Sequence, residues 1–187
     1  AFDDVEPQRK GMAVTRSSGK PMEDFDTVFQ AITAHATRAS EKLRQHGLVA
    51  GTLTVFFHTN RHRADRPQYA GSRSTRLTPM SSDTLELVAA AKRCALAAWP
   101  KMEKSYGFTK AGVMLDDLLP LEDRPRTLFD APQRSPVLMT ALDAVNSRFG
   151  KKTMVLASEG MSRSWQLRAN HRSPRYTTRI SDLPVVR

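Results

Sequence analysis

The chain has 187 residues, enough for one domain with an appendage but too few for an enzyme with accessory modules. Its 29 Lys and Arg residues exceed its 19 Asp and Glu residues, and the net charge of +10 at pH 7 indicates a polyanionic partner. Nucleic acid is the first candidate, because no stretch reaches the roughly 20 apolar residues of a spanning helix. We therefore expect a nucleic-acid-binding protein without membrane association.

The cysteine and histidine content argues against disulfides, a catalytic thiol and a metal site. The single cysteine, Cys94, excludes a disulfide framework and indicates a reducing, cytoplasmic compartment. It lies in a helical pattern, so we expect a small buried thiol rather than a nucleophile. The five histidines are scattered, whereas a zinc site needs about four converging ligands. We expect no metal and no cofactor.

The first half of the chain predicts a strand, a helix and a second strand. Residues 13–20 are expected to form the first strand, and the acids at 23–24 begin a helix that Gly47 ends. From 52 to 60 the apolar period changes to two, as in a half-buried strand. The expected core-facing residues of the helix share its spacing: Phe25, Val28, Phe29, Ile32, Ala36, Ala39 and Leu43.

The next elements complete an α+β fold. A loop at 61–72 leads to a strand at 73–80, a capping box at 82–86 opens a second helix, and a last strand runs from 108 to 115. This order predicts a ferredoxin-like βαββαβ domain: a four-stranded antiparallel sheet with two helices on one face. The other face stays open as a binding surface. The second helix is expected to carry Leu85, Val88, Ala89, Leu96 and Trp99.

Composition shifts after Pro120. We expect a domain at 1–120, an acidic linker at 121–134 and a C-terminal tail at 135–187. In the tail, 137–149 predicts a short helix and 153–157 a short strand, giving a small α/β appendage. The expected apolar side of that helix is Leu138, Leu142, Val145 and Phe149. The last 25 or so residues are rich in Arg, Ser and Pro, which is typical of segments that order only on binding.

Two groups of basic and hydroxyl residues are candidates for phosphate contacts. The first strand supplies Arg16, Ser17, Ser18 and Lys20, with the amide of Gly19. The loop and strand after residue 60 supply an arginine-dominated group against one acid, and arginine binds phosphate oxygens bidentately. Its members are Arg61, Arg63, Arg66, Arg73 and Arg76. With Lys110 we expect one patch on the open sheet face, although a solvated hairpin loop is the alternative.

Neither aromatic stacking nor catalysis is indicated. Of the pair Phe56 and Phe57, one must face the core, so the stacking platform is poor and duplex backbone binding is favoured. Asp116 and Asp117 are neighbours at a strand end and are expected to point to opposite faces, whereas polymerase chemistry needs paired carboxylates for two metal ions. No Gly-rich phosphate loop or Ser-His-Asp order is present. We expect no catalytic residues in this chain.

Four strings of the sequence resemble the UmuC type of Y-family lesion-bypass DNA polymerase: Thr15-Arg16-Ser17-Ser18-Gly19, Ala39-Ser40-Glu41-Lys42-Leu43-Arg44, Lys110-Ala111-Gly112-Val113-Met114-Leu115 and Ser173-Pro174-Arg175-Tyr176-Thr177-Thr178-Arg179. The resemblance runs from about residue 7 to the end, with Asp182-Leu183-Pro184 following the last string.

The resemblance implies a little-finger domain that grips template-primer duplex through backbone contacts in error-prone SOS repair, and a UmuC-type tail. It implies that the catalytic palm, fingers and thumb lie upstream, and that the protein is cytoplasmic and nucleoid-associated. Processed UmuD, the RecA filament and the sliding clamp are the implied partners.

The chain departs from the family pattern at two places. Ser18 replaces a phenylalanine of the family's first-strand string. Of the clamp-binding peptide only Leu128 and Phe129 remain, because Pro125 and Arg126 replace its glutamine and first leucine. Two other readings stay open: an RNA-binding ferredoxin-like module that stacks bases on Phe56, and a protein-interaction adaptor anchored by Leu128 and Phe129.

Overall fold

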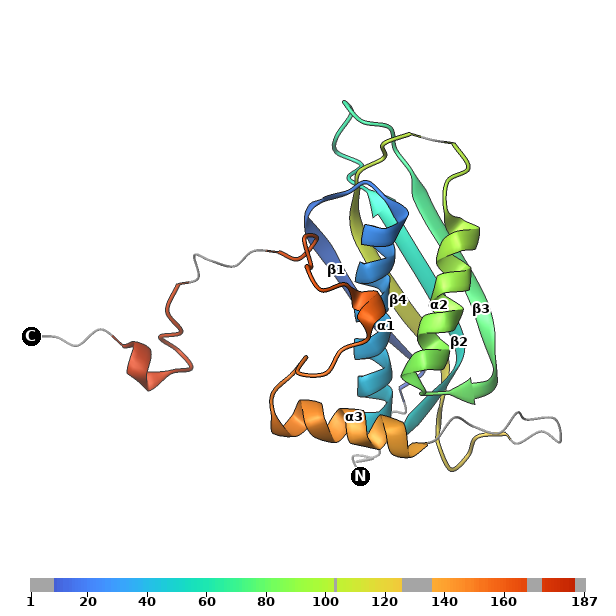
Figure 1. Ribbon diagram of the computed structural model, residues 1–187, viewed down its shortest axis with the longest axis vertical. Coiled ribbons are helices and arrows are strands. Elements are labelled where there is room, and N and C mark those ends of the chain that lie inside the picture. The colour runs from blue at the N-terminus through green and yellow to red at the C-terminus, as the bar shows by residue number, and fades with distance from the viewer. Residues whose placement is uncertain (1–8, 103, 126–135, 168–172, 184–187) are drawn as a thin grey trace, which may run out of the picture.

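A computed structural model describes residues 9–102, 104–125, 136–167 and 173–183 (Figure 1). Its first part has the order β1 (Gly11–Met22), α1 (Phe25–Gln45), β2 (Leu48–Thr59), β3 (Ala70–Ser81), α2 (Thr84–Ala98) and β4 (Phe108–Pro120). The strands form one antiparallel sheet in the order β1-β4-β2-β3, and both helices cover the same face. The predicted βαββαβ fold is confirmed.

Both helices begin where the sequence places a capping acid. The Asp24 carboxylate accepts hydrogen bonds from the Thr27 amide at 2.7 Å and the Thr27 hydroxyl at 2.8 Å. Asp83 accepts from the amides of Leu85 and Glu86 at 2.7 and 3.1 Å. These bonds satisfy amides that have no partner within the helix. Gly47, at φ 64°, ends α1 as expected.

The core lies between the helices and the sheet. The predicted α1 stripe is confirmed, with five of its residues buried and the two phenylalanines partly buried against the core. Phe57, Phe108 and Trp99 form part of an aromatic cluster at one end of the core. Cys94 is buried as expected, and burial raises the pKa of its thiol. The predictions for Ala89 and Leu96 are wrong: both are exposed, Leu96 to 55%, because α2 buries the face that carries Leu87, Ala91, Cys94, Ala95 and Ala98.

The last strand is longer than predicted. It continues to Pro120 instead of stopping at Leu115, and Asp116 pairs with Thr52 of β2 and Gly11 of β1. Asp117 has φ 54° and accepts a hydrogen bond from the Thr52 hydroxyl at 2.6 Å. The two carboxylates therefore do not point to opposite faces, because the left-handed backbone of Asp117 interrupts the strand's alternation.

Residues 136–167 of the C-terminal region fold back onto α1 and β1 (Figure 1). The region comprises α3 (Pro136–Arg148) and the short 3₁₀ helices η1 (Ala157–Glu159) and η2 (Ile180–Asp182). The predicted helix is confirmed, but the strand at 153–157 is wrong. In its place the chain turns, and the side-chain amide of Asn146 bonds the backbone of Met154 at 2.9 and 3.0 Å, as a strand partner would.

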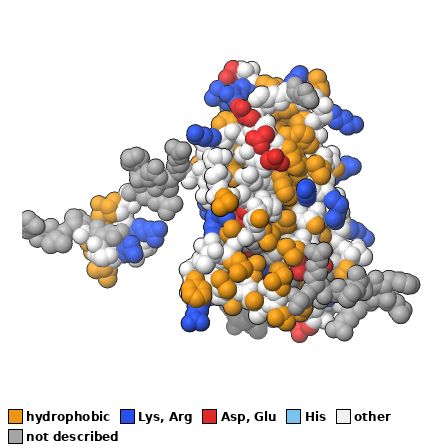
Figure 2. Space-filling view, in the orientation of Figure 1, with side chains coloured by type: hydrophobic (Ala, Val, Ile, Leu, Met, Phe, Trp, Pro, Cys, Tyr) orange, Lys and Arg blue, Asp and Glu red, His pale blue; other side chains and the backbone are white. Residues whose placement is uncertain are grey.

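The predicted buried side of α3 is confirmed at Leu142 but not at Leu138 or Phe149. Met139 and Leu142 are its buried residues, whereas Leu138 is 51% and Phe149 67% exposed. Figure 2 shows apolar side chains gathered at the surface over this helix. Among the described residues, no helix is long and apolar enough to cross a membrane.

A charged pair and an aromatic contact hold the C-terminal region in place. Arg44 donates to both carboxylate oxygens of Asp143 at 2.6 and 2.7 Å, and the arginine side chain is only 15% exposed. Trp165 is 4% exposed, and its ring meets that of His35 edge-on with centroids 5.7 Å apart. The Trp165 carbonyl accepts from the Gly19 amide at 2.9 Å. The C-terminal region is thus packed against the βαββαβ domain through residue 167.

Replacing Asp143 by Ala should lower the free energy of unfolding by about 1–3 kcal/mol, because the change leaves the largely buried guanidinium of Arg44 short of two acceptors. Urea denaturation of the whole chain measures this. Asp65→Ala is the matched control, since it removes an equally bidentate but exposed pair with Arg63 and should change stability little. Equal stability of Asp143→Ala and wild type would contradict a role for the pair in docking.

Candidate nucleic-acid interface

The sheet face that the helices leave uncovered is lined mainly by small and hydroxyl-bearing residues. We call it the open face. Because strand partners directly opposite each other share a face, the register defines four rows across β1, β4, β2 and β3. These rows are Ser17, Lys110, His58 and Ala70; Thr15, Gly112, Phe56 and Ser72; Ala13, Met114, Thr54 and Ser74; and Gly11, Asp116, Thr52 and Arg76.

Among the described residues, Phe56 is the one Phe, Tyr or Trp side chain in the rows of the open face. Phe57 is fully buried and Phe56 is partly exposed, which confirms that one of the pair faces the core. The Phe56 ring lies over Gly112, where a Cβ atom would come within 2.6 Å of the ring and 2.7 Å of Thr15. Glycine is therefore required for this close approach. A single ring is a poor platform for stacking successive bases.

Charge on the open face is polarised along the strands. Lys110 shares its row with Ser17 and His58 at the end next to the β2–β3 loop, whereas Asp116 and its neighbour Asp117 lie at the other end. The two ends are about 20 Å apart, at roughly 3.3 Å per strand residue. The basic end of the face is thus continuous with the arginine-bearing loop.

The arginines of the β2–β3 loop differ in their partners. Arg63 donates to both oxygens of Asp65 at 2.8 and 2.7 Å, and this pairing lowers the pKa of Asp65 to about 2. Arg66 lies 3.5 Å from Glu23. Within the described part of the chain Arg61 forms no ion pair, and it is exposed. Arg61 is therefore the loop arginine whose charge is least compensated.

The expected single patch does not form, because side chains alternate along a strand. Arg16 is opposite Ala111 and Arg73 opposite Val55, so both lie on the helix-covered side, at opposite edges of the sheet. Arg76 does lie on the open face, but in the row of Asp116. Of the predicted residues, Ser17, Lys20, Lys110 and the loop arginines lie at one end of the sheet.

Two donors of the first strand are engaged within the protein. The Ser18 hydroxyl donates to the carbonyls of Phe108 and Thr109 at 3.4 and 3.2 Å, and the Gly19 amide donates to Trp165. Lys20 remains exposed near the end of β1. The predicted phosphate-binding group of the first strand is thus reduced to Ser17 and Lys20.

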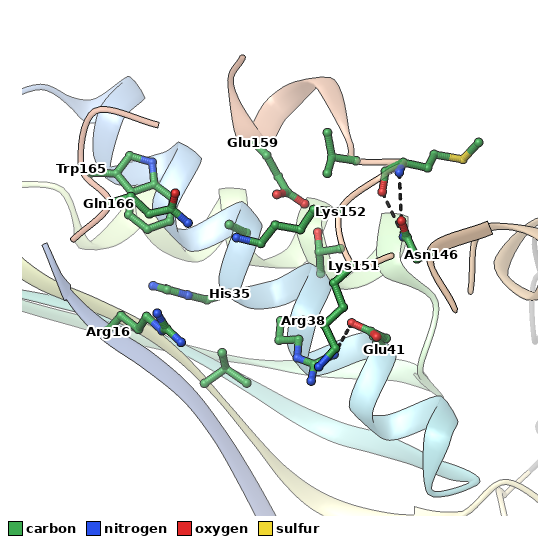
Figure 3. Close-up of a pocket in the computed structure, with 15 residues that line it drawn as sticks. Arg16, His35, Arg38, Glu41, Asn146, Lys151, Lys152, Glu159, Trp165 and Gln166 are labelled. Atoms are coloured by element: carbon green, nitrogen blue, oxygen red, sulfur yellow. Dashed lines mark hydrogen bonds and ion pairs between the residues drawn. The ribbon is translucent and has the colours of Figure 1, made fainter. Parts of the chain in front are cut away.

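A second basic site, which the sequence did not reveal, lies on the helix-covered side. Arg16, Arg38, Lys151 and Lys152 line a cavity of about 290 Å³ between β1, α1 and the C-terminal region (Figure 3). His35 also lines it and is 5% exposed. Burial, with Arg16 and Lys152 nearby, lowers the pKa of His35 to about 4. No sequence signal predicts this site, because it forms only when residues distant in sequence come together.

The remaining predictions concern the clamp-binding peptide and metal ligands. Leu128 and Phe129, the remnant of the clamp peptide, lie outside the described residues. Within the residues that the structure describes, no group of three or more His, Cys, Asp or Glu side chains is placed to hold a metal ion.

Comparison with protein-family models gives two matches. The model described as the impB/mucB/samB family C-terminal domain matches residues 9–128. A domain of unknown function, DUF4113, matches residues 136–186. Together the two matches span both the βαββαβ domain and the C-terminal region.

Curated relatives match the chain over nearly its whole length. The chain is 33% identical to protein UmuC of Salmonella typhimurium over 185 residues, which is 97% of this chain and 43% of that protein. It is 32% identical to protein SamB of the same organism over 100% of this chain and 44% of that protein. Protein MucB of Escherichia coli is 31% identical over 99% of this chain and 43% of that protein. The chain thus spans less than half the length of these relatives.

Two solved structures show more distant similarity. The little finger domain of PolIV, solved in complex with the beta-clamp processivity factor, is 14% identical with a TM-score of 0.42, covering 64% of this chain and 99% of that chain. An insertion ternary complex of Dbh DNA polymerase is 11% identical with a TM-score of 0.46, covering 61% of this chain and 31% of that chain.

The depressed pKa of His35 predicts a specific acid sensitivity. Below its ordinary value of 6.5 the unfolded chain takes up a proton that the folded chain refuses until about pH 4, so stability falls as pH falls through this window. From pH 7 to about pH 4 the wild type should lose about 2–4 kcal/mol more than His35→Gln. Urea denaturation at a series of pH values measures this. His62→Gln, in an exposed loop, should track the wild type; parallel profiles for His35→Gln and wild type would refute the assignment.

Proposed function

Because the chain belongs to the impB/mucB/samB family as its C-terminal, little-finger region, we propose that it holds DNA for an error-prone UmuC-type translesion polymerase in SOS repair. The observation that carries the proposal is the open face, whose basic end joins the β2–β3 loop. Its site residues are Ser17, Lys20, Lys110 and the loop arginines, with Arg76 further along the sheet. We place the catalytic domains in the part of the polymerase that this chain does not span.

The composition of the open face suits backbone rather than base recognition. Hydroxyl groups of Thr15, Ser17 and Ser72 are short donors that can reach phosphate oxygens, and Lys110 supplies a cation among them. Because Gly112 has no side chain, the Phe56 ring can lie close to the backbone in the middle of the face. Contacts of this kind carry no sequence information, so the module is expected to accept irregular template-primer duplex.

The charge gradient gives the duplex a preferred position. Phosphates are attracted to Lys110, Lys20 and Arg61 at one end of the face and repelled by Asp116 and Asp117 at the other, where Arg76 offsets part of the acidic charge. DNA should therefore cross the sheet near the β2–β3 loop instead of covering the whole face.

Partner binding by the remaining segments is part of the proposal. We keep the division into a little finger at 1–120, a linker at 121–134 and a tail at 135–187; the two family models match 9–128 and 136–186, so the first extends into the linker. We propose that the linker binds the sliding clamp and that the tail binds processed UmuD and the RecA filament. These assignments rest on family membership.

The alternatives predict different ligands. An RNA-binding module would stack bases on Phe56, the aromatic ring described on the open face. A protein adaptor would depend on Leu128 and Phe129. Competition of labelled duplex DNA by single-stranded RNA, with Phe56→Leu as the test variant, separates the first from the proposed function.

Removing two charges at the basic end should weaken binding to duplex of any sequence. If about four phosphates are neutralised, raising salt from 50 to 200 mM should weaken wild-type binding roughly 100-fold, and Lys110→Gln with Arg61→Gln should reduce the slope of the logarithmic plot by about 2. Fluorescence anisotropy with primer-template duplex measures both.

The matched control for this pair is Arg73→Gln with Arg93→Gln, which removes the same charge from the helix-covered side. It should leave the slope unchanged. Equal losses in the two double variants would show that net charge, and not the open face, sets the affinity.

The linker proposal makes a separate prediction. Replacing Leu128 and Phe129 together by Ala should abolish clamp binding, which we expect to be weaker than micromolar because the first half of the peptide is lost. Duplex binding should stay unchanged, since neither residue is basic. Surface plasmon resonance with immobilised clamp protein, beside the duplex assay, measures both. Unaltered clamp binding, or an unfolded variant, would remove the pair from the partner site.

A further inference from the structure

The cavity between β1, α1 and the C-terminal region gathers positive charge from three separate segments. Arg16 comes from β1, Arg38 from α1, and Lys151 and Lys152 from the turn after α3 (Figure 3). Residues so far apart in sequence meet here only because the C-terminal region docks.

The acids at this cavity are already engaged. Glu41 pairs with Arg38 at 2.5 Å, and Glu159 pairs with Arg163 at 2.5 Å. Within the described residues no ion pair is formed by Arg16, Lys151 or Lys152. These three side chains remain exposed to solvent, and an anion among them would offset the mutual repulsion of their charges.

The same surroundings act on the titratable groups that face the cavity. Burial and Arg163 lower the pKa of Lys152, and Arg16 contributes to the same effect while Glu159 opposes it. His35 contacts the cavity as a buried neutral ring. The potential of the cavity is therefore positive, and its lining favours binding of a negative group.

Apart from Arg38 Nη1, which forms an ion pair with Glu41, two buried hydrogen-bond donors of the lining lack partners among the described residues. They are the Thr37 hydroxyl and the Trp165 indole N–H. Buried polar atoms are almost always hydrogen-bonded, so such atoms commonly mark a position for water or an ion. Trp165 is 4% exposed, and its burial depends on the docked C-terminal region.

Lys152 adds a backbone observation. Its φ of 73° is a left-handed conformation that a residue with a Cβ rarely adopts. Asn, Asp or Gly would be less strained at this position. The strain is retained at a residue whose ammonium group is directed into the cavity (Figure 3).

We propose that this cavity binds a phosphate group. Guanidinium and ammonium groups from separate elements, with hydroxyl and indole donors beside them, match the several acceptor oxygens and the double negative charge of phosphate. The site lies on the helix-covered side of the sheet and shares no residue with the open face. It is therefore independent of the proposed duplex-binding surface.

The phosphate has two possible sources, a free ion or a strand of nucleic acid, and both present the same chemistry to the cavity. Isothermal titration of the whole chain with inorganic phosphate, at constant ionic strength, tests the first. A short single-stranded oligonucleotide that displaces inorganic phosphate identifies the second. Binding of the ion without displacement by the strand assigns the site to free phosphate.

A spectroscopic signal reports the site directly. Phosphate bound beside His35 should raise the pKa of that imidazole, which NMR titration of its ring protons follows with and without inorganic phosphate. Saturable binding without any shift of the His35 titration would place the ion elsewhere and overturn the proposal.

Charge removal within the cavity supplies the mutational test. Lys151→Gln with Lys152→Gln should weaken phosphate binding at least about tenfold, since each change removes a charge-assisted contact. Lys101→Gln with Lys104→Gln removes the same charge from exposed positions outside the cavity and should not weaken it. Equal loss in both double variants, or none in the first, would overturn the proposal.

A second variant guards against a folding defect. Arg16→Gln changes a residue of β1 that takes no part in the Arg44–Asp143 pair of α3, and it should weaken phosphate binding by a similar factor. Thermal melts verify that each variant is folded. Wild-type phosphate affinity in a folded Arg16→Gln chain would exclude the cavity as the binding site.

Discussion

The guanidinium of Arg44 is the group on which the position of the C-terminal region depends. It donates to both oxygens of Asp143 on α3, to the Ser82 carbonyl at 2.7 Å and to the Thr84 hydroxyl at 3.0 Å. A largely buried cation is stable only when its donors are satisfied, so these partners cannot separate independently. Arg44 thereby fixes the relative positions of three segments: the end of α1, the start of α2, and α3. This arrangement in turn brings the turn after α3 against β1.

Most of the fold could be predicted because local signals and the hydrophobic period agree. Asp24 and Asp83 lie where capping acids belong, and Gly47 ends α1. The failures have identifiable causes. The acidic residues after Leu115 resemble a strand end, but partners on both β1 and β2 keep β4 paired through Asp116. The turn at 153–157 has strand-like residues, but its backbone partner is the Asn146 side chain, which no pattern of apolar residues reveals.

The candidate site was predictable only in part. Lys110 and the loop arginines lie near one end of the sheet, as their charge suggested. The predicted patch, however, was based on charge alone and ignored the alternation of side chains along a strand, which puts Arg16 and Ser17 on opposite faces. That error was avoidable from the sequence, since neighbouring residues of a regular strand point to opposite faces of the sheet. The cavity at Lys152 was not, because it arises from tertiary docking of a segment more than a hundred residues from β1.

The contact between Gly19 and Trp165 has a consequence for self-association. β1 is an edge strand, and the edges of sheets present unpaired backbone groups to which strands of other molecules can add. The Trp165 carbonyl occupies the Gly19 amide, and a Cβ atom at Gly19 would come within 2.9 Å of the Gln166 carbonyl. The C-terminal region therefore covers the β1 edge at Gly19, and another strand cannot pair with that amide while the region is docked. The docked C-terminal region thus limits aggregation through this part of the edge, and the absence of a side chain at Gly19 allows the close approach.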